Sequence, residues 1–268
     1  MNQSDTALAV QPVSFSRFST WLYCPRRYLY RYILESPEER ASGNFVFGSA
    51  IHEAFEAFMR SLKDDPLNHE AVVAVFERAM HDEIALNQHH GVPVDWGKKS
   101  ADEMLAKGAE LIDVFLQKVD RHVTVIGTEV PFTVEFADDI VVNGVIDLLL
   151  DEGDGRYRVV DLKTSASSLA QDRLEFDLQP TVYLLAAERI LAAPGKVDFE
   201  FWVLTKAKSP AFRIYPVQRS QAQRAEVLEV IRDVRAAEAA GIFPRQRSYM
   251  CFGCEHRDKC DGECRKGA

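Results

Sequence analysis

The chain has 268 residues, of which 47% are hydrophobic and 27% charged, as is typical of a soluble globular protein with one large or two small domains. It contains no run of 18 or more apolar residues, so no membrane span is predicted. The polar residues 1–11 lack the pattern of a secretory signal, which makes the cytoplasm the expected compartment. The net charge of −9 argues against a generally basic nucleic-acid binder, although a bound divalent cation partly reverses the charge of an acidic site.

The first predicted elements are two short helices. One is expected over 16–22, with Ser14 or Ser16 as its N-cap, and the next begins with Pro25 in its first turn. Basic and aromatic side chains alternate at the start of the second helix. Such a surface suits a nucleic-acid strand, held by charge and stacking, and equally suits a cover over a core. The residues that open this helix are Arg26, Arg27 and Tyr28.

An amphipathic helix is predicted over 47–59, and its apolar residues recur at helical spacing on one face. His52 lies beside that face in the first turn of the helix. More helix is expected at about 69–87 and 101–120.

From residue 122 the hydrophobic period changes to that of strands. The segment 128–136 alternates, and two apolar runs, 142–150 and 156–163, flank the turn residues 152–155. The pattern predicts a strand followed by a β-hairpin.

Folding this hairpin about residue 154 places Asp147 opposite Asp161, and alternation directs Asp161 and Lys163 to the same side. Two carboxylates and an ammonium group then converge on one point. That arrangement suits a divalent cation and a water molecule to be activated. The competing interpretation is a charged strand edge in solvent.

A long helix is predicted over 174–193, with Asp177 as its N-cap and Pro180 in its first turn. Gln179 and Tyr183 are four residues apart, so they share one face of it. The remaining predicted elements are strands over 197–205 and 212–217 and a helix over 220–240.

The order of elements predicts an α/β fold with a central mixed β-sheet of about five strands flanked by helices. We expect four regions along the chain. These are a flexible N-terminus (1–12), a helical part with Cys24 and His52 (13–121), the α/β core (122–240) and a cysteine segment packed back on the helical part (241–268).

Five cysteines are unevenly distributed, and their odd number in an expected reducing compartment favours metal ligation over disulfides. The C-terminal four have the spacing Cys251-x2-Cys254-x5-Cys260-x3-Cys264. These four can form a local zinc site. Alternatively, Cys24 joins the first three around a [4Fe–4S] cluster and Cys264 is spare. The spacing leaves both open, and in either case metal holds a segment too poor in apolar residues to fold alone.

Six motifs in order resemble the PD-(D/E)XK nuclease superfamily, from about Ser14 to Cys260. Within it, the chain is similar to the RecB-like branch with an iron–sulfur cluster, which includes the AddB nuclease domain and the CRISPR-associated adaptation nucleases. The motifs are Cys24-Pro25 followed by basic and aromatic residues, Gly48-x3-His52, Gly144-x2-Asp147, Asp161-Leu162-Lys163, Gln179-x3-Tyr183, and Cys251-x2-Cys254-x5-Cys260.

The resemblance implies a restriction-endonuclease-like core and hydrolysis of DNA phosphodiester bonds with Mg²⁺ or Mn²⁺. It implies an exonuclease for single-stranded DNA or DNA ends, in recombination, repair or CRISPR adaptation. The implied metal ligands are His52, Asp147, Asp161 and the Leu162 carbonyl oxygen. The other implied catalytic residues are Lys163, Gln179 and Tyr183, and the implied cluster ligands are Cys24, Cys251, Cys254 and Cys260. Weaker DNA contacts are expected from Arg26, Arg27 and Tyr28.

Two departures from the family pattern matter. Asp161 takes a place often held by Glu, and Cys264 is additional, which keeps zinc as an alternative. The chain has no helicase motif, so we expect any helicase or recombination partner to be a separate protein. The alternative function is a non-catalytic DNA-binding or scaffold protein with a structural zinc or iron–sulfur site.

Overall fold

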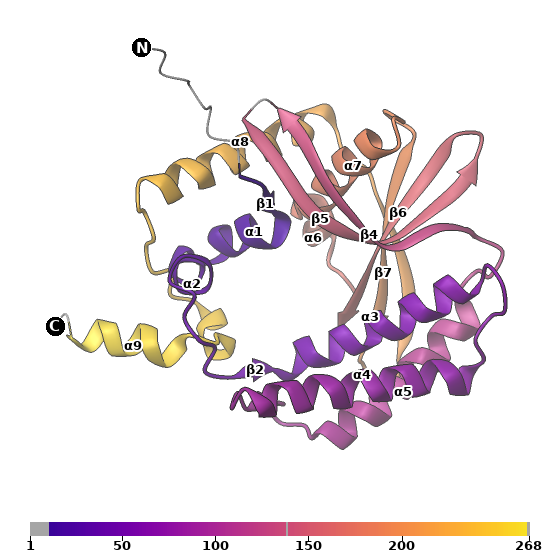
Figure 1. Ribbon diagram of the computed structural model, residues 1–268, viewed down its shortest axis with the longest axis horizontal. Coiled ribbons are helices and arrows are strands. Elements are labelled where there is room, and N and C mark those ends of the chain that lie inside the picture. The colour runs from indigo at the N-terminus through magenta and orange to yellow at the C-terminus, as the bar shows by residue number, and fades with distance from the viewer. Residues whose placement is uncertain (1–10, 138, 267–268) are drawn as a thin grey trace, which may run out of the picture.

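The computed structural model describes residues 11–137 and 139–266, and shows an α/β fold with one central mixed sheet (Figure 1). The strands of this sheet are β1 (Val13–Ser14), β4 (Thr124–Ala137), β5 (Ile140–Gly153), β6 (Arg156–Ser165), β7 (Val197–Thr205) and β8 (Ala211–Val217). The α-helices are α1 (Phe15–Tyr23), α2 (Pro25–Tyr28), α3 (Gly43–Ser61), α4 (His69–His89), α5 (Ala101–Lys118), α6 (Gln171–Phe176), α7 (Gln179–Ile190), α8 (Gln221–Ala239) and α9 (Arg257–Lys266). Shorter elements are the π-helix η1 (Leu29–Ile33), the 3₁₀-helix η2 (Tyr249–Gly253) and the paired strands β2 (Ala41–Ser42) and β3 (Val94–Asp95).

The predicted mixed sheet is confirmed. Strands β4, β5 and β6 form an antiparallel meander, β7 pairs parallel with β6, and β8 is antiparallel to β7. The two-residue strand β1, which the sequence did not predict, pairs parallel with β5. The parallel β6–β7 pair is connected through α6 and α7, as a parallel connection requires a crossover.

Two hydrophobic cores lie on opposite faces of the sheet. One contains the apolar side chains of α3, α4 and α5, including Phe55 and Phe115, packed against Leu148 and Leu162. The other contains those of α1, α7 and α8, packed against residues such as Phe199. Figure 1 shows the α3–α5 layer below the sheet and α7 and α8 above it. The helices of the N-terminal part therefore form one layer of the fold around the sheet.

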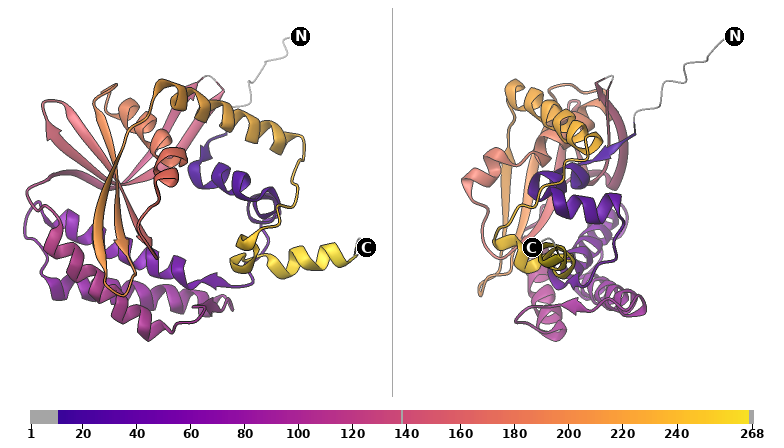
Figure 2. Two further views of the ribbon diagram at one scale, coloured as in Figure 1. Left: turned by 180° about the vertical axis from the view of Figure 1, so that it is seen from behind. Right: turned by 90° about the vertical axis from the view of Figure 1, so that its left-hand side faces the viewer.

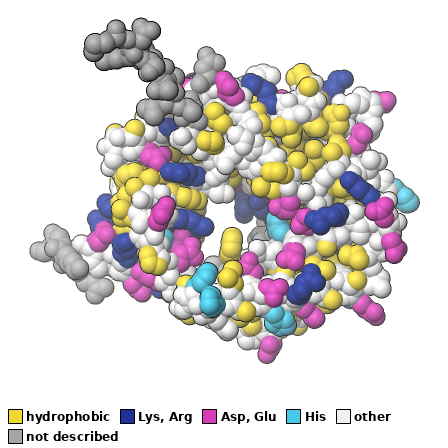
Figure 3. Space-filling model, in the orientation of Figure 1, with side chains coloured by type: hydrophobic (Ala, Val, Ile, Leu, Met, Phe, Trp, Pro, Cys, Tyr) yellow, Lys and Arg dark blue, Asp and Glu magenta, His cyan; other side chains and the backbone are white. Residues whose placement is uncertain are grey.

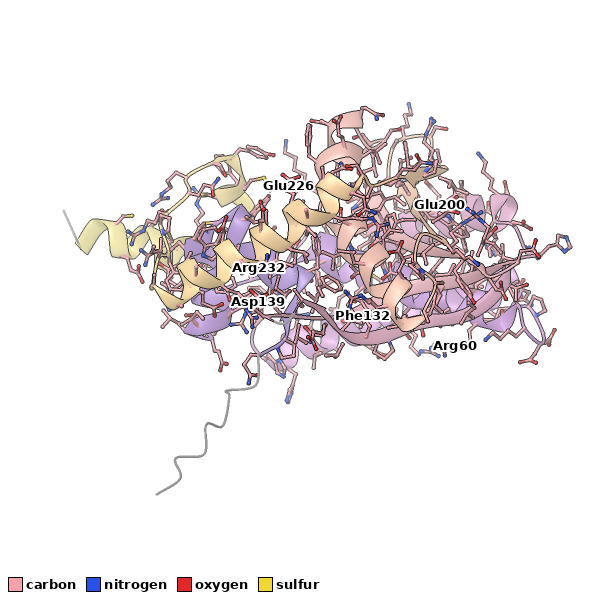
Figure 4. The ribbon with its side chains drawn as sticks, turned by 90° about the horizontal axis from the view of Figure 1, so that it is seen from above. Arg60, Phe132, Asp139, Glu200, Glu226 and Arg232 are labelled. Carbon is pink, nitrogen blue, oxygen red and sulfur yellow. The ribbon has the colours of Figure 1, made fainter. Side chains whose placement is uncertain are left out.

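Local capping explains where several helices begin. The Ser14 side chain accepts a hydrogen bond from the Arg17 N–H, as predicted for the N-cap of α1. Capping boxes open α5 at Ser100 and α8 at Ser220. At the far end of α8, Arg232 and Asp139 form an ion pair of 2.8 Å that ties this helix to the start of β5, and Figure 4 shows the two residues close together.

The prediction of one long helix over 174–193 is wrong, because the helix is divided into α6 and α7. A proline at position 180 lacks an N–H and its ring clashes with the carbonyl of Phe176, so α6 ends there. Asp177 is extended, and its carboxylate accepts a hydrogen bond from the Gln179 N–H at 2.9 Å. The break allows α7 to begin with Gln179 directly at the sheet.

The cysteine segment packs against the N-terminal helices, as Figures 1 and 2 show. Arg27 donates to Glu255 at 2.8 Å, and the Tyr30 hydroxyl donates to Glu263 at 2.7 Å. The carboxylate of Glu39 accepts from the first backbone N–H groups of α9 and so caps that helix. Two ends of the chain are thereby joined by several polar contacts.

The flexible segment expected over 1–12 lies, apart from its last two residues, outside the described part of the structure. Within the described residues, no helix is both long and apolar enough to cross a membrane.

Candidate active site

Asp147 lies on β5 at the point where the sheet divides. On one edge of β5, residues 142 and 143 pair with β1, and residues from 148 onward pair with β6. Between these ladders, residues 144–147 have no ladder partner on that edge within the described chain. The carboxylate of Asp147 instead accepts a hydrogen bond from the Leu162 N–H of β6 at 2.9 Å. Its side chain therefore replaces a backbone contact where β6 separates from β5.

The helix α3 brings His52 to the same point. The Nδ1 atom of His52 lies 3.4 Å from Oδ2 of Asp147, and the two side chains are 30% and 15% exposed. Both side chains are thus partly buried yet open to a ligand. The two residues, far apart in the sequence, approach each other as their places in the implied ligand set require.

Asp161, Lys163 and Gln179 form one hydrogen-bonded network. The Lys163 ammonium donates to Asp161 Oδ1 at 3.1 Å and to Gln179 Oε1 at 2.9 Å, and the Gln179 amide donates to Asp161 Oδ1 at 2.5 Å. The second oxygen, Asp161 Oδ2, lies 2.8 Å from Lys163 Nζ but outside hydrogen-bond geometry, and it has no hydrogen-bond partner in the described residues. A buried carboxylate oxygen without a donor is suited to a cation.

Burial raises the pKa of Asp161 to about 6, and the negative charge of Asp147 acts in the same direction. The Lys163 ammonium opposes this rise. The buried carboxylate thus retains its charge at neutral pH only with a cation beside it. A divalent metal at this position would supply further positive charge.

Glu129 is the site residue that the sequence analysis missed. One ligand atom from each of His52, Glu129 and Asp147 lies within 4.8 Å of the others, a spacing that can hold a metal ion. Asp161 is outside this group. Burial and the charge of Asp147 raise the pKa of Glu129. The strand pairs Thr128–Leu148 and Val130–Ile146 bracket Glu129 and Asp147, so folding the β4–β5 hairpin as well would have found it.

The backbone at Glu129 is in the left-handed region, with a φ of 48°. This conformation costs about 1 to 2 kcal/mol in a residue with a Cβ. Strained residues cluster at functional sites, where the surrounding structure holds them in place. The strain therefore accompanies the placement of the carboxylate beside Asp147.

Tyr183 and Leu162 border the network. The ring of Tyr183 packs edge-on against Phe132 at 5.8 Å, and burial with the charges of Asp161 and Asp147 raises the pKa of its hydroxyl. The Leu162 side chain is fully buried in the core of the α3 layer, while its N–H binds Asp147. The residues expected at the site from α3, β5, β6 and α7 are thus brought together.

The expected DNA contacts on α2 are engaged elsewhere. Tyr28 is fully buried and its hydroxyl accepts from Arg17 at 2.7 Å, so it offers no ring face to a base. Arg27 binds Glu255, and Arg26 lies 3.9 Å from Glu263. The expectation that Tyr28 stacks on DNA does not fit this burial, because the helix uses its aromatic residues to cover a core.

Four cysteines line one small cavity of about 30 Å³ together with several arginines. They are Cys24, Cys251, Cys254 and Cys260. Cys264 is not among the lining residues, and its sulfur accepts from Arg247 at 3.2 Å. The arrangement joins the N-terminal thiol to the first three C-terminal thiols, as the cluster alternative requires.

Comparison with known proteins gives a consistent result. Residues 12–261 match the family model of the PD-(D/E)XK nuclease superfamily. Two proteins from Streptococcus pyogenes, serotypes M49 and M1, each named as a subunit of an ATP-dependent helicase/deoxyribonuclease, are 20% identical over 193 residues, which are 70% of this chain and 17% of the relatives' length. A crystal structure from Eubacterium rectale, named as a candidate exonuclease, superposes with a TM-score of 0.56 at 17% identity, covering 96% of this chain and 93% of that one. The structural similarity concerns the fold.

Proposed function

Because the chain belongs to the PD-(D/E)XK nuclease superfamily, we propose that it is a metal-dependent deoxyribonuclease that hydrolyses phosphodiester bonds. The observation that carries the proposal is the convergence of Asp147, Asp161 and Lys163 with His52 where β5 and β6 separate. A scaffold protein has no need of a buried carboxylate that lacks a hydrogen-bond donor.

The ligands we propose for Mg²⁺ or Mn²⁺ are His52, Asp147, Asp161 and the Leu162 carbonyl oxygen, with Glu129 as an additional carboxylate. The orphaned Asp161 Oδ2 and the spacing of His52, Glu129 and Asp147 both fit a divalent cation. Such an ion lowers the pKa of a bound water and stabilises charge on the phosphate. An imidazole ligand suits Mn²⁺ better than Mg²⁺, so we expect higher activity with Mn²⁺.

Lys163 would orient the attacking water and offset the negative charge that grows on the phosphate. Its ammonium is held by Asp161 and by the Gln179 carbonyl oxygen, which fixes its direction. Gln179 is itself fixed by Asp161 and by the Asp177 cap. Tyr183, on the same helix face, would support the phosphate or this network.

The expected substrate is single-stranded DNA or a DNA end. Figure 3 shows a hollow at the middle of the molecule, between the cysteine segment and the sheet, with Lys or Arg side chains and a histidine along its rim. A strand that enters such a hollow lengthwise needs a free end. The streptococcal relatives, named as parts of a helicase/deoxyribonuclease, agree with a separate helicase or recombination partner, in repair, recombination or CRISPR adaptation.

We propose a [4Fe–4S] cluster at Cys24, Cys251, Cys254 and Cys260, with zinc at the C-terminal cysteines as the alternative. The shared cavity of these four thiols supports the cluster. Its role would be to hold the ends of the chain together, since hydrolysis requires no redox step.

A nuclease assay tests the function. Purified protein is incubated with linear and circular single strands of the same sequence, and with linear duplex, in Mg²⁺, Mn²⁺ or EDTA. We expect cleavage of the linear single strand with Mn²⁺ above Mg²⁺ and none in EDTA. Rapid cutting of circles would contradict the exonuclease assignment, and absence of cleavage in every metal would contradict the enzyme itself.

A further inference from the structure

One face of α3 carries exposed residues on both sides of the proposed metal ligand. Phe45, Ser49, His52, Glu56 and Arg60 follow at intervals of three and four residues, so they lie along one stripe of the helix. With a rise of 1.5 Å per residue, Phe45 lies roughly 10 Å before His52 along the axis, and Arg60 about 12 Å after it. The stripe thus runs past the site in both directions.

The stripe begins in a cavity of about 520 Å³ between α3, α4 and the cysteine segment. Phe45 is 67% exposed there, a costly position for a phenyl ring. Aromatic and guanidinium groups share this cavity, a combination that binds unpaired bases and their backbone. Those lining residues are Phe45, Trp96, Arg27, Arg31 and Arg40.

The donors of two of these arginines are available. Arg31 approaches Glu255 at 3.7 Å and Arg40 approaches Asp95 at 3.8 Å, both longer than a hydrogen bond. A strand in this cavity would therefore gain hydrogen bonds without breaking strong ones.

The stripe ends in a second cavity of about 490 Å³, which His52 and Glu129 line together with Arg60 and Arg78. The side chains of Arg60 and Arg78 are 64% and 63% exposed, and Arg78 lies 3.6 Å from Glu53, outside hydrogen-bond distance. Figure 4 shows Arg60 at the edge of the molecule. A phosphate between these guanidinium groups would lie beside the metal ligands.

We propose that the exposed face of α3 is the floor on which a single DNA strand lies. An unpaired base stacks on Phe45 on one side of the metal centre, and Arg60 and Arg78 bind a backbone phosphate on the other side. A phenyl ring on a helix surface reaches only a base that has left its duplex. The proposal rests on the proposed nuclease function and names the contacts that orient its substrate.

The test is the affinity for a fluorescein-labelled oligothymidylate, measured by anisotropy with Ca²⁺ in place of the catalytic metal and with strand integrity checked on gels. Phe45→Ala should weaken binding about 5- to 150-fold, the range for loss of one stacked base, and Phe45→Trp should restore it. With an abasic strand of the same length, wild type and Phe45→Ala should bind equally.

Arg60→Ala and Arg78→Ala should each reduce the slope of log affinity against log salt by about 0.7, whereas Phe45→Ala should leave it unchanged. The matched controls are Ile214→Ala on β8, an exposed apolar residue, and Arg156→Ala, an exposed arginine paired with Asp198. Neither control should alter affinity or slope.

The inference is overturned if Phe45→Ala binds oligothymidylate as wild type does, if it loses equal affinity for the abasic strand, or if the arginine variants keep the full salt slope. These outcomes are independent of cleavage. Cleavage by wild type with unchanged binding by the variants would reject the inference alone. Normal binding without cleavage in any metal would reject the nuclease function alone.

Discussion

The Asp147 carboxylate accepts a hydrogen bond from the Leu162 backbone N–H, joining β5 to β6 just beyond their last ladder pair. A side chain here takes the place of a strand contact, which allows the backbone of β6 to move away from β5. In the opening, groups from both faces of the sheet can meet, namely His52 from the α3 layer and Gln179 from α7. The site exists because the sheet is incomplete at this point.

The buried carboxylate of Asp161 makes the stability of the metal-free protein depend on pH. Its pKa of about 6 exceeds the unfolded value, so the folded state binds this proton more tightly and the group destabilises the protein above pH 6. Relative to Asp161→Asn, the wild-type free energy of unfolding should increase by about 2 kcal/mol from pH 7.5 to pH 4.5. Denaturant titrations of both proteins in EDTA measure this difference. An unchanged difference would mean that the carboxylate is not buried without a partner.

Replacement of Lys163 by alanine should abolish cleavage while the fold survives. The loss should be at least about 100-fold, the range for a group that positions a proton transfer. The rate is measured with Mn²⁺ on a linear single strand, and circular dichroism checks the fold. Lys208→Ala is the matched control, because Lys208 is exposed in the turn between β7 and β8. Full activity of purified Lys163→Ala would remove this residue from the mechanism.

The strained backbone of Glu129 predicts opposite effects on stability and metal binding. Glu129→Gly should raise the free energy of unfolding of the metal-free protein by roughly 1 kcal/mol, since glycine accepts a positive φ and the repulsion from Asp147 is gone. The same variant should lose much of the increase in melting temperature that Mn²⁺ gives the wild type. Glu35→Gly is the control, because Glu35 has a φ of 43° but lies outside the site. It should gain stability and keep the Mn²⁺ effect; an equal loss in both variants would exclude Glu129 as a ligand.

Two cysteine variants separate the cluster from a local zinc site. We expect brown protein with visible absorption when it is purified without oxygen. Cys24→Ser should lower the iron content and the melting temperature, whereas Cys264→Ser should change neither, because Cys264 lies outside the shared cavity. Zinc in place of iron, together with an unchanged Cys24→Ser protein and a destabilised Cys264→Ser protein, would establish the local knuckle.

The sequence was sufficient for elements whose signals are local. The turn at residues 152–155 and the alternation of the flanking strands placed Asp147 opposite Asp161 correctly, and serine caps placed the starts of α1 and α5. The break between α6 and α7 was missed because tertiary contacts do not mark it in the pattern; only Pro180 does, and it also fits a first turn. The extra strand β1 was missed because two residues give no periodicity.

The missed site residue has a similar explanation. Glu129 alternates with apolar neighbours like any outward-facing strand residue, so its chemistry depends on pairing with β5 and on a φ that no pattern reveals. The orientation of Tyr28 was likewise undecided, because an aromatic residue among arginines fits both a core and a nucleic-acid surface until its burial is known.

The cavity shared by Cys24 and the C-terminal thiols also orders events during synthesis. Its last contributor, Cys260, emerges from the ribosome long after the sheet and α3 can form, so the hollow beside the metal site stays open at one side until then. A nascent chain can therefore fold its catalytic strands first and acquire its closing cluster last. Cluster insertion would in this way act as the final step that turns an open cleft into an enclosed path for DNA.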